Sequence, residues 1–385
     1  MTTDAFGNTK IKVPFFSPYI DRLDKKAVSI ALKSTLLTDG PKLREFEAKF
    51  SQFTGAKHAV GVSNATAALH LSLKTLGIGS GDEVIVPDMT FAATANAVLL
   101  TGATPVIVDV DSLDMNMSVT SLEKSITHKT KAILPVHFAG KACKIDRIKK
   151  IARSNKIYLI EDCAHAIGTR VCGKHVGTFG DAGCFSFYPT KNITTLEGGM
   201  LITDKKKIAD AASSARNHGI TKSLGQRYTS KKPWDYDIVT PGYNYRLDEI
   251  RSSLGLSQLK KITRLNNLRK KAFEYYNEGL QDVNGIEIPD KGLEGEHSFH
   301  LYIIKVKKEF KISRDALYSK LLKSGIRTTV HYKPLHMFSV MKKKAKTSYD
   351  ELINSKQIYQ QALSLPLYPE ISKKQQDLVI QALTS

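Results

Sequence analysis

One lysine of the chain lies in a setting that favours covalent chemistry. Lys191 is in the stretch SFYPTKNITTLEGG, between an aromatic apolar run and a Glu-Gly-Gly turn. A lysine on a loop between two buried strands loses hydration, and desolvation favours the neutral amine that forms a Schiff base. Ser186, five residues earlier, offers a hydroxyl to an anion. The pattern predicts a Schiff-base lysine beside an anion site.

A carboxylate stands at the end of another apolar run, in KIYLIEDCAHAIGT. Glu161 and Asp162 end that run, and a buried carboxylate there needs a cationic partner because an unpaired charge is costly. A protonated ring nitrogen would serve. His165 follows three residues after Asp162 and either packs over a ligand or is a satisfied structural histidine.

A third motif, VSNATAALHLSL, runs from a short strand into a helix. Ala65 and Thr66 fall in the first turn, where free amides and the helix dipole favour a phosphate and the Thr66 hydroxyl can add a bond. The alternative is that Ser63 or Asn64 simply caps the helix.

The three motifs together match the requirements of one cofactor. They supply a phosphate cradle, a strand-end aspartate for a ring nitrogen and, about thirty residues after that aspartate, a loop lysine. These are the groups that hold pyridoxal 5′-phosphate (PLP).

The elements around these motifs alternate between strands and helices. Short β-branched runs begin near residue 58 and alternate with helical patterns as far as IYLIEDCA. This order predicts an α/β domain with a mostly parallel sheet covered on both faces. Ligands of such sheets bind at the carboxyl ends of the strands, which is where the three motifs fall.

The pattern changes after Arg246. Apolar residues at three-to-four spacing predict one long connecting helix, with a strongly basic opposite face, over residues 246–280. HSFHLYIIKV predicts a strand over 297–306, and a helix is expected from Arg314 to Ser324. A smaller α+β domain therefore follows the first.

Composition excludes several classes of protein. The chain has 385 residues, of which 42% are hydrophobic, enough for a large domain and a smaller one. The N-terminus lacks the apolar core of a signal peptide, and the apolar runs are too short and broken to span a bilayer. We expect a cytoplasmic protein without a membrane partner.

Charge and cysteines add two expectations. The net charge of +20 is dispersed over the chain, which favours solvated faces that attract a phosphorylated small molecule over a nucleic-acid site. The four cysteines form no C-x-x-C pair, which argues against a zinc site and against a disulfide framework. We expect no bound metal.

Nearly the whole chain resembles the DegT/DnrJ/EryC1/StrS family of PLP-dependent sugar aminotransferases. The resemblance runs from LLTDGPKLREFEAKF through IEDCAHAIGT, SFYPTKNITTLEGGMLITD and GYNYRLDEIRSSLGLSQL to HYKPLH. It implies fold type I, with a mostly parallel seven-stranded sheet flanked by helices in a large domain and a smaller C-terminal α+β domain. We expect the large domain over residues 1–250, with an N-terminal segment that can pack on the small domain, and the connecting helix and small domain over 251–385.

The resemblance also implies roles for single residues. Lys191 would carry the cofactor and shuttle protons, and Asp162 would keep the pyridine nitrogen protonated. Phe91 would stack on the ring, His165 would lie against it, and Asn244 would reach the phosphate from a neighbouring subunit. The remaining cofactor contacts would be Ala65, Thr66 and Ser186. Such a homodimer shares its active sites.

Two further segments are candidate substrate contacts by the same resemblance. Thr38 and Asp39 in TDG, and His331 and Tyr332 in HYKPLH, would approach the sugar nucleotide, or belong to an ordinary turn and loop. The chain departs from the family pattern at Leu196, where many relatives have glycine, and over 224–240, which is long. Neither departure touches a group needed for imine chemistry, although the long segment can alter substrate choice.

The implied reaction transfers the amino group of L-glutamate to a keto-sugar linked to a nucleoside diphosphate, giving an amino sugar for surface glycans. HFAGK and HYKPLH resemble the branch that acts at C4 of 4-keto-sugars more than the branch that acts at C3. A related sugar dehydratase has histidine at the lysine position, so Lys191 argues against it. A DNA-binding regulator on this fold would carry a separate DNA-binding domain, which we do not expect here.

Overall fold

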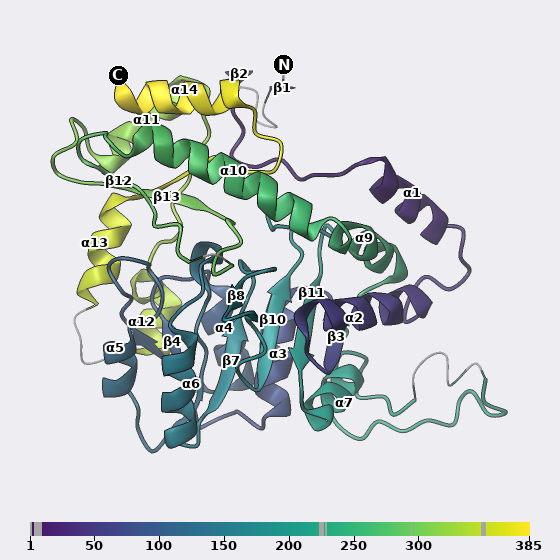
Figure 1. Ribbon diagram of the computed structural model, residues 1–385. Coiled ribbons are helices and arrows are strands. Elements are labelled where there is room, and N and C mark those ends of the chain that lie inside the picture. The colour runs from purple at the N-terminus through teal and green to yellow at the C-terminus, as the bar shows by residue number, and fades with distance from the viewer. Residues whose placement is uncertain (1, 4–9, 223–226, 228, 294, 348–351) are drawn as a thin grey trace.

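The computed structural model describes residues 2–3, 10–222, 227, 229–293, 295–347 and 352–385. Of the long segment at 224–240, residues 224–226 and 228 lie outside the described residues. Most of the described chain folds around one large sheet, with a smaller layer of helices and strands above it (Figure 1).

The large sheet has eight strands in the order β14-β5-β4-β6-β7-β10-β11-β3. Every strand is parallel to its neighbours except β11, which is antiparallel to both β10 and β3. The strands are β3 (His58–Val62), β4 (Glu83–Pro87), β5 (Thr104–Val108), β6 (Thr130–Ile133), β7 (Tyr158–Asp162), β10 (Ala182–Ser186), β11 (Gly199–Thr203) and β14 (Lys346–Thr347). The α/β class is confirmed, and the expected seven strands gain a two-residue edge strand, β14, from the C-terminal part.

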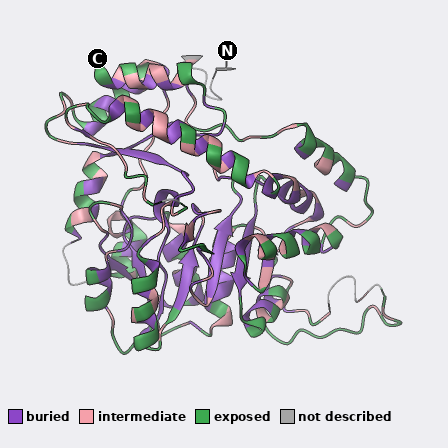
Figure 2. Ribbon diagram, in the orientation of Figure 1, coloured by how far each residue is buried: buried purple, intermediate pink, exposed green. Residues whose placement is uncertain are grey.

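Helices cover both faces of this sheet, because successive side chains of a strand point to opposite sides. Val84 and Val86 enter one buried cluster and Ile85 the other. Figure 2 shows the strands as a buried layer. The helices that contribute to the Ile85 cluster are α2 (Pro41–Thr54), α5 (Val119–Lys124), α6 (Ile145–Ser154), α9 (Glu249–Leu259) and the start of α10 (Ile262–Leu280). Those of the Val84 cluster are α3 (Ala65–Thr75), α4 (Ala93–Thr101), α7 (Lys206–Ala215) and α12 (Ser339–Lys344).

A three-stranded antiparallel sheet, β12-β13-β15, forms the smaller layer. Its elements and the helices near it are α10 (Ile262–Leu280), β12 (Ile286–Glu287), β13 (Tyr302–Val306), α11 (Arg314–Lys323), α13 (Ile353–Gln361), β15 (Ala362–Leu365) and α14 (Lys373–Thr384). Val13 packs into this layer's buried cluster and bridges Ile326. We propose a division of the chain at residue 250.

The remaining described elements are short or peripheral. They are β1 (Thr2–Thr3), β2 (Lys10–Ile11), α1 (Arg22–Ala31), η1 (Phe138–Gly140), β8 (Arg170–Val171), β9 (Lys174–His175) and η2 (Leu335–Met337). The described residues contain no helix long and apolar enough to cross a membrane. The four cysteines are unpaired, and Cys172 alone among them is exposed.

Two predicted elements differ from the structure. The connecting helix is two helices, α9 and α10, separated at Lys260 and Lys261. The Lys261 side chain forms ion pairs with Asp21 and Asp24 at 2.8 and 2.7 Å, which anchors the break on α1. The strand predicted over 297–306 begins only at Tyr302, because Phe299 has a φ of 56°, outside the extended region.

Candidate active site

Lys191 lies on the loop between β10 and β11, at the carboxyl end of β10. Its amide donates to the Tyr188 carbonyl at 2.9 Å. The next residue, Asn192, donates from Nδ2 to the Ser298 carbonyl and to Asn266 Oδ1, both at 2.7 Å. Because these bonds tie the loop to the smaller layer and to α10, the position of Lys191 depends on both parts of the molecule.

The amine of Lys191 is held in a poorly hydrated site. Burial lowers the pKa of Lys191 to about 8, the Asp162 carboxylate opposes this shift, and the Arg269 guanidinium adds to it. No described residue forms a hydrogen bond or ion pair with its Nζ. With this pKa roughly a tenth of the amine is neutral at pH 7, far more than for an ordinary lysine, and the neutral amine is the state that attacks a carbonyl.

Asp162 ends β7, the neighbour of β10 in the sheet. Its Oδ1 accepts a hydrogen bond from the Ala164 amide at 3.1 Å, and its Oδ2 accepts one from the Thr94 hydroxyl at 2.9 Å. Burial raises the pKa of Asp162, while these two donors, Lys191 and His137 oppose the rise. A carboxylate can accept about four hydrogen bonds, so Asp162 keeps room for a cationic donor.

The start of α3 retains free amides. Asn64 caps the helix by accepting from the Ala67 amide at 2.8 Å, as one sequence alternative expected. The amides of Ala65 and Thr66, at the first two helical positions, have no acceptor among the described residues. The cap and a phosphate site are therefore compatible, because the cap satisfies a different amide.

The sheet brings Ser186 towards this helix start. Ser186 pairs with Gly199 on β11, and Gly199 pairs with Val62, three residues before Ala65. A Cβ on Gly199 would lie 2.5 Å from the Asn64 carbonyl carbon and oxygen, so only glycine permits this close approach. The Ser186 hydroxyl accepts from the Tyr188 amide at 3.3 Å, and its own hydrogen remains for an anion.

His165 contacts the HYKPLH segment across the site. Its Nδ1 accepts from the Ala139 amide at 3.3 Å, so in the neutral ring Nε2 carries the hydrogen and donates to the Tyr332 oxygen at 3.2 Å. Burial holds the pKa of His165 well below its usual value, which keeps the ring neutral. The Tyr332 ring lies 5.9 Å from that of Phe91 and 6.0 Å from that of Phe138.

HYKPLH is anchored at both ends. Nδ1 of His331 lies 2.8 Å from the Ser364 hydroxyl, and burial lowers the pKa of His331 to about 3. The His336 amide donates to Asp88 at 2.9 Å, and its Nδ1 lies 2.6 Å from the same carboxylate. Asp88 follows β4, so the large sheet holds this segment over the site.

Other predicted residues lie apart from Lys191 in the described chain. Asn244 is exposed and bridges Asn217, and no described contact joins it to Lys191. Thr38 bridges Asp248, and Asp39 lines a separate cavity of about 740 Å³. Phe91 as a residue is 61% exposed, which leaves surface for a ligand.

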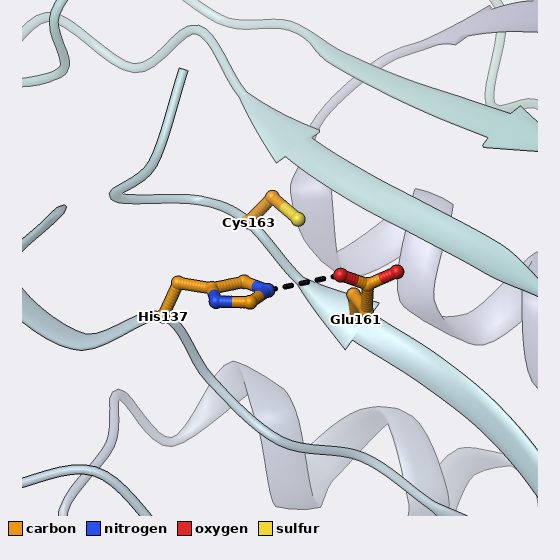
Figure 3. A group of neighbouring side chains, drawn as sticks. All are labelled: His137, Glu161 and Cys163. Atoms are coloured by element: carbon orange, nitrogen blue, oxygen red, sulfur yellow. Dashed lines mark hydrogen bonds and ion pairs between the residues drawn. The ribbon is translucent and has the colours of Figure 1, made fainter. Parts of the chain in front are cut away.

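A buried cluster beside this site resembles a metal centre and is saturated. His137, Glu161 and Cys163 have potential ligand atoms within 4.8 Å of one another (Figure 3). Glu161 already accepts four hydrogen bonds, at 2.7–3.1 Å, from His137 Nε2 and the amides of Gly177, Phe179 and Gly180. His137 Nδ1 accepts from the Cys143 amide at 3.2 Å. Glu161 therefore has no free lone pair for a metal ion.

Sequence reasoning missed the two threonines that support Asp162. Thr90 and Thr94 lie in DMTFAATANAV, and their spacing of four residues is that of neighbours on one face of a helix. That spacing was the available signal, but nothing in the sequence joined it to Asp162. The hydrogen bond between His165 and Tyr332 was likewise visible only in the structure.

The donor set suits the cofactor that the sequence predicted. Lys191 offers a partly neutral amine, Asp162 a buried carboxylate with free lone pairs, and the Ala65 and Thr66 amides an anion cradle. An aldehyde, a protonated ring nitrogen and a phosphate are the groups that these three would bind.

Three comparisons with known proteins show the family and the fold of the chain. The model of the DegT/DnrJ/EryC1/StrS aminotransferase family matches residues 18–384. The spore coat polysaccharide biosynthesis protein SpsC of Bacillus subtilis (strain 168) is 39% identical over 373 residues, which cover 96% of each chain.

Solved structures resemble the fold over nearly its whole length. The putative sugar aminotransferase Spr1654 from Streptococcus pneumoniae, in its PMP form, has a TM-score of 0.90 and 32% identity, covering 97% of this chain and 98% of the other. PseC of Helicobacter pylori, an aminotransferase involved in the biosynthesis of pseudoaminic acid, has a TM-score of 0.89 and 32% identity with the same coverage. Spr1654 has also been solved in a PLP form.

Proposed function

The chain belongs to the DegT/DnrJ/EryC1/StrS aminotransferase family, and on that premise we propose that it transfers the amino group of L-glutamate to C4 of a nucleoside-diphosphate 4-keto-6-deoxyhexose. It is a PLP-dependent sugar aminotransferase of sugar or polysaccharide biosynthesis. The proposal adds the donor, the position on the sugar, the roles of single residues and the use of the product in surface glycans.

One observation carries the proposed chemistry. The Lys191 amine and the Asp162 carboxylate stand at the carboxyl ends of adjacent strands, and each keeps bonding capacity that no described residue uses. When bound, PLP supplies an aldehyde and a ring that accepts electrons. Asp162 would hold the ring nitrogen as a cation, and the amides of Ala65 and Thr66, with Ser186, would hold the phosphate.

Lys191 would serve as both base and acid. A pKa of about 8 lets its Nζ take up a proton from the amino acid and return it on the sugar side without a large energetic cost in either direction. Phe91 would cover one face of the ring, and neutral His165 would lie against the ring without adding a charge. The HYKPLH segment, which is anchored at both ends, would cover these groups and exclude water from them.

The sugar side is assigned to the segment that covers the site. Tyr332 receives its hydrogen bond from His165, so its own hydroxyl hydrogen can be donated to a sugar oxygen. His331 would contact the same substrate. The name of SpsC refers to spore coat polysaccharide and that of PseC to pseudoaminic acid, which supports a surface glycan as the destination.

Two parts of the proposal concern the assembly. Asn244 is exposed, and its proposed partner is the cofactor phosphate in a neighbouring subunit of a homodimer with shared active sites. Asp39, which lines the separate cavity, and Thr38, the residue before it, would contact the nucleotide end of the substrate. We place the enzyme in the cytoplasm, without nucleic-acid or membrane partners.

The test follows the cofactor spectrum through each half of the reaction. L-glutamate should convert the aldehyde form of the holoenzyme to the amine form, and a 4-keto-sugar on UDP, dTDP or GDP should restore it. Restoration by 3-keto-sugars alone would move the reaction to C3. Conversion by another amino acid in place of glutamate would replace the proposed donor. If the holoenzyme sediments as a monomer, the proposal that two subunits share an active site is wrong.

A further inference from the structure

A chain of two threonine hydroxyls ends on the carboxylate of Asp162. The hydroxyl oxygens of Thr90 and Thr94 are 2.8 Å apart, and the Thr94 hydroxyl donates to Asp162 Oδ2 at 2.9 Å. All three side chains are buried, with at most 4% of each residue exposed. Thr90 precedes α4 and Thr94 is in its first turn, so the chain approaches Asp162 from a different element than Lys191 does.

The hydrogens of this chain have one consistent arrangement while Asp162 is ionised. A carboxylate only accepts, and each hydroxyl has a single hydrogen. Thr94 gives its hydrogen to Asp162, so it must accept from Thr90 in the other contact. Both hydroxyls therefore point their donors along one direction, towards the negative charge.

This donation opposes the effect of burial on Asp162. The groups that act on the carboxylate are the Ala164 amide, the Thr94 hydroxyl, the charge of Lys191 and the His137 ring, and each of them favours the ionised form. Burial favours the protonated form. A protonated carboxyl would lose its attraction for a ring cation, so the balance between these effects decides how well Asp162 can serve.

We propose that Thr94 is a positioning residue that keeps the Asp162 carboxylate ionised and aimed at the ring nitrogen of the cofactor, with Thr90 orienting Thr94. The inference rests on the proposed pairing of Asp162 with that nitrogen. It does not depend on which sugar or which amino donor the enzyme uses.

The experiment compares two cofactors that differ at one atom. PLP and its 1-deaza analogue, in which a C–H group replaces the ring nitrogen, are titrated into the apo-enzyme, and dissociation constants are measured by absorbance. The variants are Thr94→Val, which keeps the shape and removes the hydroxyl, Thr94→Ser, which restores it, and Thr90→Val.

We expect Thr94→Val to weaken PLP binding about tenfold or more, since a hydrogen bond to a charged group is lost. Binding of the deaza analogue should change by less than about twofold in the same variant, because that analogue places no cation beside Asp162. Thr94→Ser should bind PLP as the wild type does. Thr90→Val should weaken PLP binding by a smaller factor, about two- to fivefold, because it acts through Thr94.

The outcomes separate positioning from packing. Equal weakening of both cofactors by Thr94→Val, or no weakening of either, overturns the proposal. Should Thr94→Val fail to fold, as judged by circular dichroism, Thr90→Val with Thr94→Ser carries the comparison, and Thr90→Val must then distinguish PLP from the analogue. No sugar or amino donor is present, so an incorrect substrate assignment leaves this result unchanged.

Discussion

Glu161 and Asp162 are neighbours on β7 and point to opposite sides of the strand. Glu161 accepts four hydrogen bonds, all from its own chain, and is fully buried. Asp162 accepts two, from Ala164 and Thr94, and is almost as buried. Burial is the same for both carboxylates, so it does not identify the functional one.

Saturation distinguishes the two regions. The hydrogen-bonding capacity of Glu161 is used up by the segment at 177–180 and by His137. The role of the Glu161 cluster is therefore structural. The region of Lys191 and Asp162 retains unused capacity at an amine, a carboxylate and two helix amides. A buried group with unused capacity is costly unless a ligand completes it, so we propose the region where such capacity is found at an amine, a carboxylate and two helix amides together as the site.

The largest expected effect comes from Lys191→Ala in the unsaturated region. The rate of the half-reaction with glutamate should fall about 10²- to 10⁴-fold, because the positioned base is removed. The free energy of unfolding of the apo-enzyme should stay the same or rise, since a poorly hydrated amine without a partner is lost. Stopped-flow absorbance and urea unfolding measure the two quantities. A loss of stability without a loss of rate would contradict the comparison.

Glu161→Gln should show the opposite pattern. Two buried amides and the partly buried Gly180 amide would lose a carboxylate acceptor, so the free energy of unfolding should fall by about 2–5 kcal/mol. Asp162→Asn is the matched control on the same strand, and it should change the stability of the apo-enzyme by less than about 1 kcal/mol, because only two donors are affected.

The order of the two substitutions should be reversed for activity, with the larger loss in Asp162→Asn. The folded fraction of Glu161→Gln should keep most of its PLP affinity, whereas Asp162→Asn should lose about 10- to 100-fold in the half-reaction rate, the equivalent of one charged hydrogen bond. If both substitutions affected stability and rate alike, saturation would not separate the two carboxylates.

The pH dependence of the free energy of unfolding should report the lowered pKa of Lys191. The pKa of Lys191 in the folded apo-enzyme is about 8, and the usual value is 10.5. Between these values the unfolded chain binds one proton more than the folded chain, so the free energy of unfolding of the wild type should rise with pH relative to Lys191→Met. Below pH 8 the difference should be constant.

Urea unfolding of both apo-proteins from pH 7 to 10.5 measures this difference, and other titrating groups cancel in it. Pulsed acetylation followed by mass spectrometry gives a second reading, in which Lys191 should react with a midpoint near pH 8. A midpoint near 10.5 would show that the amine is hydrated.

The smallest expected effect concerns Tyr332→Phe, at the edge of the unsaturated region. The variant removes the hydroxyl that accepts from His165 and would donate to a sugar oxygen, so kcat/KM for the keto-sugar should fall about two- to tenfold. The half-reaction with glutamate is the control and should change less. A larger loss with glutamate than with the sugar would place Tyr332 on the donor side.

Local sequence patterns predicted the central strands and the helices beside them closely. VSNATAALHLSL predicted a strand followed by a helix, and the structure has β3 and α3 there. The failures occur where distant contacts override a local pattern. Lys261 turns onto Asp21 and Asp24 and divides the connecting helix, and Phe299 leaves the extended region where its segment crosses Ala139.

For the site, residue type and strand order alone pointed to Lys191, Asp162, Thr66 and Ser186, because parallel strands end at one edge of a sheet whatever the packing around them. The partners of these residues depend on folding. Asp162 lies 68 residues from Thr94, and Tyr332 lies 167 residues from His165, distances at which no local pattern acts. The chemistry of the groups was therefore readable from the sequence, whereas the tertiary structure decided which groups are saturated, since a hydrogen bond requires a partner within about 3 Å and only packing of distant segments provides one.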